Sequence, residues 1–144
     1  MPEALQGYVL AFDYGKRRIG VAVGQALTRS ASALETVDHH QQPDWPAIER
    51  LVKEWRPSLL LVGLPLGAEG DETDMSREAR KFGAALQARF DKPVEYSDER
   101  FTSRAAEVRF AEQRAEGNLR RKHGSQLDAM AAQIILENWL QSQP

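Results

Sequence analysis

The sequence predicts a single α/β domain in which a mixed five-stranded sheet carries helices on both faces. Three observations favour this fold class. Three runs of strand length come first and are joined by short connections, as is typical of antiparallel strands. Two further apolar runs then alternate with helical patterns, as in βαβ units with parallel strands. One of these runs, LLLV at 59–62, is apolar at every position, which is expected of a strand buried on both faces.

The first three strands are expected at residues 8–13, 19–23 and 31–37. The run YVLAFD is closed by Tyr14-Gly15, and IGVAV alternates branched residues with glycine or alanine. The short segment between these two runs suits a hairpin connection. The third run is weaker and precedes a polar stretch, 38–43, which predicts a loop.

Helical and strand patterns alternate over the rest of the chain. Apolar residues recur at helical spacing between Trp45 and Trp55, and Pro57 ends that pattern. A similar stripe runs from Met75 to Phe90. The expected elements are, in order, helix 44–55, strand 59–62, loop 63–73, helix 74–90, strand 93–97, helix 102–115, loop 116–124 and helix 125–140.

Composition excludes several classes of protein and site. The length of 144 residues suits one domain spanning 1–144, and 42% hydrophobic residues allow a substantial core. The absence of cysteine excludes disulfides and thiolate metal sites, so any metal would have oxygen ligands. No apolar run approaches the ~20 residues that span a bilayer. The first residues carry Glu3 and no positive segment, unlike a secretory signal, so we expect a cytoplasmic protein without membrane partners.

Positive charge is concentrated in two segments of a chain whose formal net charge is −2. Residues 100–123 contain seven Lys or Arg and three Glu, which gives that segment +4 and leaves −6 for the remainder. A second cluster, Lys16, Arg17 and Arg18, closely follows Asp13. Local basic patches on an acidic body can bind a phosphate backbone. Either cluster could equally be a solvated surface rich in arginine.

Three carboxylates are expected to meet at one edge of the sheet. Asp13 ends the first strand, Glu99 follows the last strand, and Asp128 lies in the first turn of the last helix. The carboxyl ends of the strands form a crevice in such a sheet, and the last helix can overhang it. Phosphodiester hydrolysis can use two divalent ions about 3.5–4 Å apart, and Mg²⁺ or Mn²⁺ prefers carboxylate oxygens. The pattern therefore indicates a metal-dependent nuclease.

Each acid also has a purely structural interpretation. Asp13 could open a turn, and Asp98 with Glu99 could be a solvated pair before a helix. Asp128 fits a capping box that begins at Ser125, in which it would only satisfy amides at the helix end. Against that interpretation, Asp128 shares a face with small alanines and Ile135 that would pack on the sheet, where an acid needs a partner. Whether Asp98 shares the role of Glu99 stays open.

Four segments of the chain carry recognisable motifs: DYGKRRIGVA at 13–22, VGLPL at 62–66 with Gly70 downstream, DERFTS at 98–103, and DAMAA followed by IILE at 128–137. Taken together, they resemble the YqgF family, which is also called RuvX. The resemblance covers nearly the whole chain in the correct order. Members of this family are relatives of the RuvC resolvase within the ribonuclease H-like superfamily.

The resemblance implies a ribonuclease H-like fold and metal-binding acids that map onto Asp13, Glu99 and Asp128. It further implies a role in trimming the 5′ end of precursor 16S ribosomal RNA, with junction resolution as an older proposal for the family. The sequence departs from the family at RRKHG, 120–124, which is more basic than the usual lead-in to the last helix.

These observations predict an endonuclease that hydrolyses structured RNA with two Mg²⁺ or Mn²⁺ ions. Asp13 would bridge the ions, and Glu99 and Asp128 would each complete the ligands of one. Two groups of basic residues would contact the substrate. Lys16, Arg17, Arg18 and Arg100 would hold phosphates beside the site, and Arg120, Arg121 and Lys122 would hold the substrate further out.

Three alternatives differ in substrate or class. A resolvase of branched DNA would need a two-fold dimer. We expect a monomer or a weak homodimer, and no feature of the sequence indicates a stable dimer. A ribosome assembly factor that binds RNA without cleaving it would gain nothing from three acids facing phosphate. An ATPase of the actin and sugar-kinase type shares the D-x-G turn but needs a second large domain, which 144 residues cannot supply.

Overall fold

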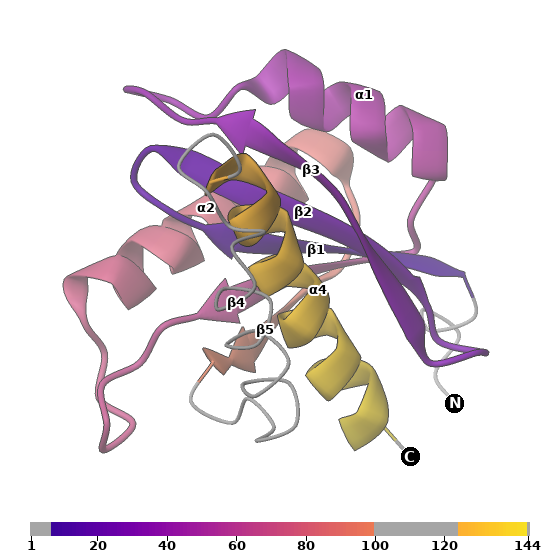
Figure 1. The fold of residues 1–144 in the computed structure, drawn as a ribbon. Coiled ribbons are helices and arrows are strands. Elements are labelled where there is room, and N and C mark those ends of the chain that lie inside the picture. The colour runs from indigo at the N-terminus through magenta and orange to yellow at the C-terminus, as the bar shows by residue number, and fades with distance from the viewer. Residues whose placement is uncertain (1–6, 100–123, 144) are drawn as a thin grey trace.

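A five-stranded mixed sheet with the strand order β3-β2-β1-β4-β5 forms the centre of the fold (Figure 1). The computed structural model describes residues 7–99 and 124–143. The elements are β1 (Tyr8–Tyr14), β2 (Arg18–Gln25), β3 (Ser30–Asp38), α1 (Trp45–Trp55), β4 (Leu59–Leu64), α2 (Asp74–Phe90), β5 (Val94–Asp98) and α4 (Gly124–Ser142). The predicted mixed sheet is therefore confirmed.

The sheet combines an antiparallel half with a parallel half, as predicted. β1 pairs with β2, and β2 with β3, in antiparallel register. The β2–β3 pair has an irregularity between Val21 and Ala22. β4 lies parallel to β1 on the other side, and β5 lies parallel to β4. All six residues of β4 are buried, in agreement with its continuous apolar sequence.

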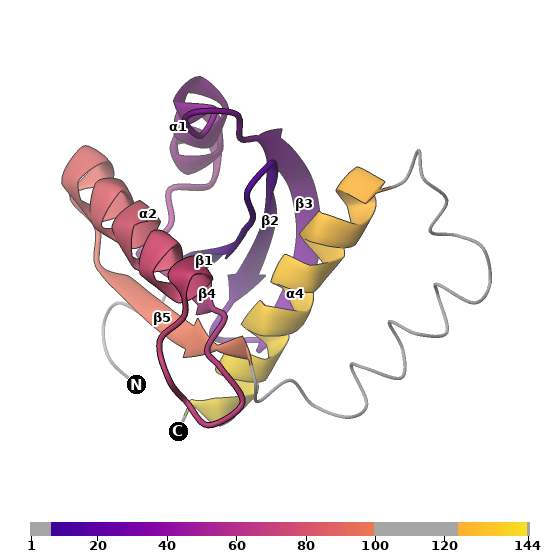
Figure 2. The ribbon, with the colours of Figure 1, turned by 90° about the vertical axis from the view of Figure 1, so that its left-hand side faces the viewer.

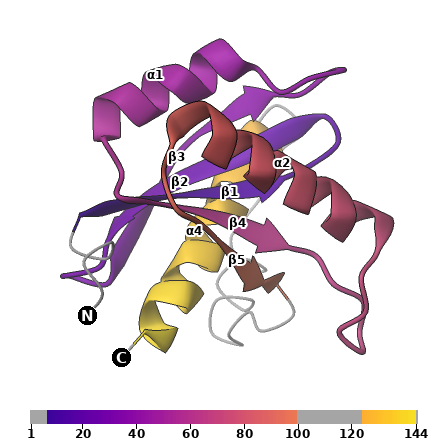
Figure 3. The same cartoon turned by 180° about the vertical axis from the view of Figure 1, so that it is seen from behind.

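The alternation of side chains along the central strand β1 divides the core into two parts. Leu10 and Phe12 belong to the part that packs against α1 and α2. Val9 and Ala11 belong to the part that packs against α4. Among the described helices, Figures 2 and 3 show α1 and α2 together on one face of the sheet and α4 on the other. Odd-numbered positions of β1, including Asp13, therefore point toward the α4 face.

Local signals set the ends of the first two helices. The Asp44 carboxylate accepts a hydrogen bond from the backbone N of Ala47 at 3.2 Å and caps α1. The chain leaves α1 through Arg56, whose left-handed φ of 46° precedes Pro57. Thr73 and Ser76 form a reciprocal capping box at the start of α2.

Several sequence predictions lie outside the described residues. These are the helix at 102–115, most of the loop at 116–124, and the basic residues Arg100, Arg120, Arg121 and Lys122. Within the described part of the chain, no helix combines the length and apolar character needed to cross a membrane.

Candidate active site

Asp13 lies between two glycines on the α4 face of the sheet. Its antiparallel partner on β2 is Gly20. On the other side, β1 and β4 pair as far as Phe12 and Val62, so Gly63 follows next to Asp13. Because neither neighbour has a side chain, the surface around the Asp13 carboxylate is open to groups from elsewhere in the fold.

Gly20 allows α4 to approach the sheet closely. A Cβ atom at Gly20 would lie only 1.8 Å from the backbone oxygen of Asp128. Ala129 and Ala132 are buried on the same helix, and their small side chains permit this approach. The contact places the N-terminal part of α4, with Asp128, over the β2 side of Asp13.

Gly63 makes the corresponding space on the β4 side. A Cβ atom there would lie 2.8 Å from the Glu99 Oε1 atom and 2.8 Å from Ile135 Cδ1. The carboxylate of Glu99 thus occupies the space above Gly63 and reaches Asp13. Neither glycine was predicted as a site residue from the sequence, although a glycine inside a strand is a signal of close approach.

Asp13 and Glu99 form a buried pair that shares a hydrogen bond. Burial raises the pKa of Asp13 to about 8, and the charges of Glu99 and Asp128 add to the increase. Burial also raises the pKa of Glu99, and nearby Asp98 acts in the same direction. Two carboxylates in contact cannot both ionise cheaply, so the pair retains a shared proton to a higher pH than an isolated carboxyl would.

Asp128 is paired with Arg18. The Nε atom of Arg18 lies 2.9 Å from Oδ2 of Asp128. That oxygen is buried and has no hydrogen-bond partner, because the close approach of the two atoms lacks hydrogen-bond alignment. Burial raises the pKa of Asp128, and Arg18 opposes the increase. The prediction that Asp128 lies in the first turn of this helix is wrong, because the helix begins at Gly124 and Asp128 is its fifth residue. The Asp128 carboxylate faces Arg18.

The predicted phosphate-binding cluster is divided by this arrangement. Arg18 contacts the site itself through Asp128. Lys16 and Arg17 are exposed on the β1–β2 turn and make no ion pair within the described part of the chain. They therefore remain available to a ligand.

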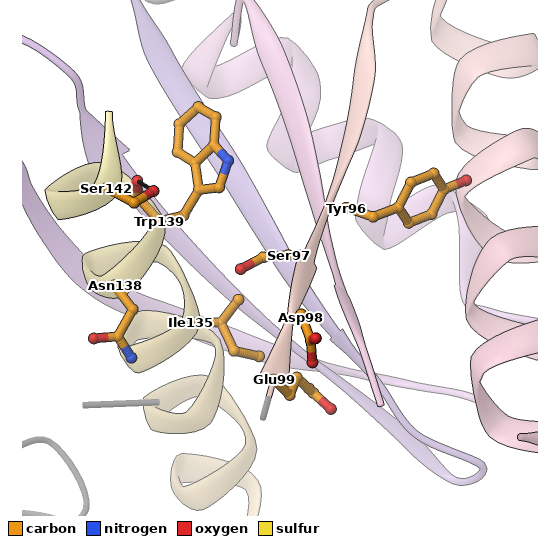
Figure 4. A pocket seen from close by; sticks show the side chains of 8 residues that line it. All are labelled: Tyr96, Ser97, Asp98, Glu99, Ile135, Asn138, Trp139 and Ser142. Atoms are coloured by element: carbon orange, nitrogen blue, oxygen red, sulfur yellow. Dashed lines mark hydrogen bonds between the residues drawn. The ribbon is translucent and has the colours of Figure 1, made fainter. Parts of the chain in front are cut away.

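A cavity of about 280 Å³ lies beside Glu99, between β5 and α4 (Figure 4). Asp98 and Glu99 line one end, and Asn138 and Trp139 of α4 line the other side. Asp98 ends β5 opposite Leu64, with Glu99 immediately after it. Asp98 thus influences Glu99 through its charge, while Glu99 is the residue that contacts Asp13.

The chemistry of the three carboxylates, though not a single shared cluster, suits a hard divalent ion such as Mg²⁺ or Mn²⁺. The donors are all oxygens. The Oδ2 atom of Asp128 is buried and has no hydrogen-bond partner, and a bound cation could take the place of that partner. Among residues 7–99 and 124–143, no three His, Cys, Asp or Glu side chains are grouped closely enough to hold one ion. Asp13 instead has one acidic neighbour on each side, Glu99 and Asp128.

We expect the metal-free protein to lose stability as the pH is raised from about 4 to about 8. Over this range the unfolded chain has already released the Asp13 proton, whereas the folded protein still holds it, because the pKa rises from 3.8 to about 8 on folding. The stabilisation is complete below the unfolded pKa and disappears above the folded one. Thermal unfolding in chelator, compared with Asp13→Asn, would isolate this contribution, since the variant should lack it. Parallel pH profiles of the two proteins would contradict the assignment.

Comparison with known proteins gives consistent results over almost the whole chain. A family model described as "RuvX: Holliday junction resolvase" matches residues 7–142. The "Putative pre-16S rRNA nuclease" of Chromohalobacter salexigens is 51% identical over 140 residues, which are 96% of this chain and 93% of that protein. The protein of the same name from Xanthomonas euvesicatoria pv. vesicatoria is 46% identical over 145 residues, with 97% and 94% covered.

The fold is shared with solved resolvase structures. T. thermophilus RuvC in complex with Holliday junction substrate has a TM-score of 0.52 and 20% sequence identity, with 93% of each chain covered. A second T. thermophilus RuvC structure gives 0.51 and 16%. The ribonuclease H-like architecture expected from the sequence is confirmed.

Proposed function

The chain belongs to the RuvX family, and from this premise we propose that it is a metal-dependent nuclease that processes precursor 16S ribosomal RNA. The observation that carries the proposal is the buried pair of Asp13 and Glu99, with Asp128 on the other side of Asp13. Three partly buried acids at one edge of a sheet are costly unless a cation binds there. The names of the relatives, which are 43–51% identical, supply the substrate class.

Asp13, Glu99 and Asp128 would hold Mg²⁺ or Mn²⁺, with Asp13 shared between two ions. A bound divalent ion supplies a Lewis acid that lowers the pKa of water and offsets charge on the phosphate. Binding of a divalent ion would require the pair of Asp13 and Glu99 to release the proton that the two carboxylates share. Pairing of β1 with β2 and β4 gives Asp13 a fixed position between its acidic neighbours Glu99 and Asp128.

The basic residues near the site would position the substrate. Arg18 lies against Asp128 with a side chain that is 48% exposed, so its guanidinium can contact both the carboxylate and a phosphate. Lys16 and Arg17 extend this positive surface along the β1–β2 turn. Contacts of this kind orient the backbone without reading its sequence.

Hydrolysis of branched DNA is the second candidate, because the matching family model is described as a Holliday junction resolvase. The same carboxylates would serve either substrate, so the site itself does not discriminate between them. A resolvase cuts a symmetric junction at paired positions and would act as a two-fold dimer. A protein that binds RNA without cleaving it is disfavoured, because the buried acids would repel phosphate.

The proposed function is tested by giving purified protein two substrates in parallel. With Mn²⁺, we expect removal of the 5′ extension from precursor 16S ribosomal RNA and weaker or no cleavage of a four-way DNA junction. Excess chelator should stop the reaction, because the acids alone repel the phosphate. Gel analysis of end-labelled substrates measures both reactions. Cleavage of the junction alone would assign the protein to the second candidate, and full activity in chelator would contradict the metal site.

A further inference from the structure

A groove of about 550 Å³ lies on the opposite face of the sheet from the carboxylates, beside the β1–β2 turn. Figure 2 views the molecule from the side on which this turn lies. Three parts of the chain form the walls of the groove. They are the end of β1 and the following turn, with Tyr14 and Lys16, the segment after β3 with His39, and α2 with Arg77 and Lys81. Asp13 and Tyr14 are adjacent on β1 and point to opposite faces, so the groove and the Asp13 carboxylate lie on either side of the same end of β1.

The charges that face the groove favour an anion. The two acids on its α2 wall are already engaged: Asp74 pairs with Arg77, and Glu78 accepts a hydrogen bond from the Tyr14 hydroxyl. Lys16 and Lys81 are exposed, and in the described ranges neither makes an ion pair or hydrogen bond. Three cationic side chains, Lys16, Arg77 and Lys81, therefore line the groove against two carboxylates, which leaves an excess of positive charge.

His39 makes the wall of the groove rigid. Its Nδ1 atom lies 2.7 Å from the Gly15 carbonyl oxygen and donates a hydrogen bond to it, because the carbonyl can only accept. The backbone N of His39 donates to the Arg17 carbonyl at 2.9 Å. The ring is 8% exposed and packs against Tyr14 with centroids 5.0 Å apart. These contacts fix the backbone of the turn that carries Lys16, so the Lys16 side chain starts from a defined position beside the groove.

We propose that this groove binds a backbone phosphate of the RNA substrate outside the bond that is cut. The proposal rests on the proposed nuclease function and adds a substrate contact to it. A strand that passes from the Asp13 side over the β1–β2 turn would meet Lys16 first and then Lys81 on α2. Lysine is a flexible point charge suited to phosphate contacts of this kind. The contact would add affinity that does not depend on sequence.

The test compares Lys81→Gln with Lys92→Gln, both in an Asp13→Asn background that prevents cleavage. Lys92 follows the C-terminal end of α2 and does not line the groove, so it controls for the loss of one charge. Binding of fluorescent precursor RNA is measured by anisotropy between about 50 and 200 mM salt. We expect Lys81→Gln to weaken binding and to reduce the slope of log affinity against log salt by about 0.7–0.9. Lys92→Gln should leave both unchanged.

A second measurement locates the contact and identifies the source of the phosphate. The NMR signals of the His39 ring should shift when a short RNA is added, and Lys81→Gln should reduce the shift. Inorganic phosphate at the same phosphate concentration should have little effect. Equal RNA affinities and equal salt slopes for the two lysine variants would overturn the proposal that the groove binds phosphate. A shift of the His39 signals with inorganic phosphate but not with RNA would also overturn it. If the parent protein bound no RNA at all, the proposed function itself would fail.

Discussion

Replacing Asp13 by Asn is expected to abolish cleavage without unfolding the protein. Asn keeps the shape of the side chain but removes the charge that a shared divalent ion requires, so turnover should fall by more than about a hundredfold. The position is held by pairing of β1 with both β2 and β4, and these backbone contacts do not depend on the carboxylate. Rates on precursor RNA with Mn²⁺ measure the loss.

The same variant should be at least as stable as the parent in the absence of metal. At pH 8 and above, folding leaves Asp13 and Glu99 in contact with raised pKa values, and a neutral amide relieves that repulsion. The stabilisation gained by adding Mg²⁺ should shrink, because binding stabilises in proportion to affinity for the folded state. Asp91→Asn is a matched control at an exposed position just after α2 and should change neither property. Wild-type turnover in Asp13→Asn would contradict the site.

The architecture could be predicted because each half of the sheet has a distinct sequence pattern. The run LLLV of β4 is buried at every position, as a strand covered on both faces requires. Alternation in β1 assigns Asp13 to the same face as Val9 and Ala11, which is the face that α4 covers. Asp13 and Glu99 could be predicted as neighbours because both follow from the positions where strands end.

The contacts across the site could not be predicted, because they depend on register and helix placement. Arg18 is expected to hold phosphate, and the structure adds an ion pair with Asp128, which is far away in sequence. The number of residues between Arg18 and Asp128 does not determine which side of the sheet the start of α4 packs over. Gly20 and Gly63 likewise become site residues only when their strands are paired with β1 and their missing side chains coincide with incoming groups.

Substitution by alanine is expected to have different effects at the two glycines beside Asp13: lower stability at Gly20 and lower activity at Gly63. At Gly20 the new Cβ would lie 1.8 Å from a backbone oxygen of α4, which cannot rotate away. The helix would have to shift as a whole, so Gly20→Ala should lower the free energy of unfolding by about 1–3 kcal/mol or more. Chemical denaturation measures this change. Gly7→Ala is the control, because its Cβ would meet only the Ser58 side chain at 3.1 Å.

Gly63→Ala should instead leave a folded protein with little activity. Its Cβ would meet the Glu99 carboxylate and the end of the Ile135 side chain, and both can rotate aside at small cost. Glu99 would then be displaced from Asp13, and a misplacement of about 1 Å can reduce turnover by roughly a hundredfold. The pH dependence of metal-free stability should weaken as well, because the shared proton loses its acceptor. A Gly63→Ala protein with normal turnover would show that the position of Glu99 above Gly63 is not the one used in catalysis.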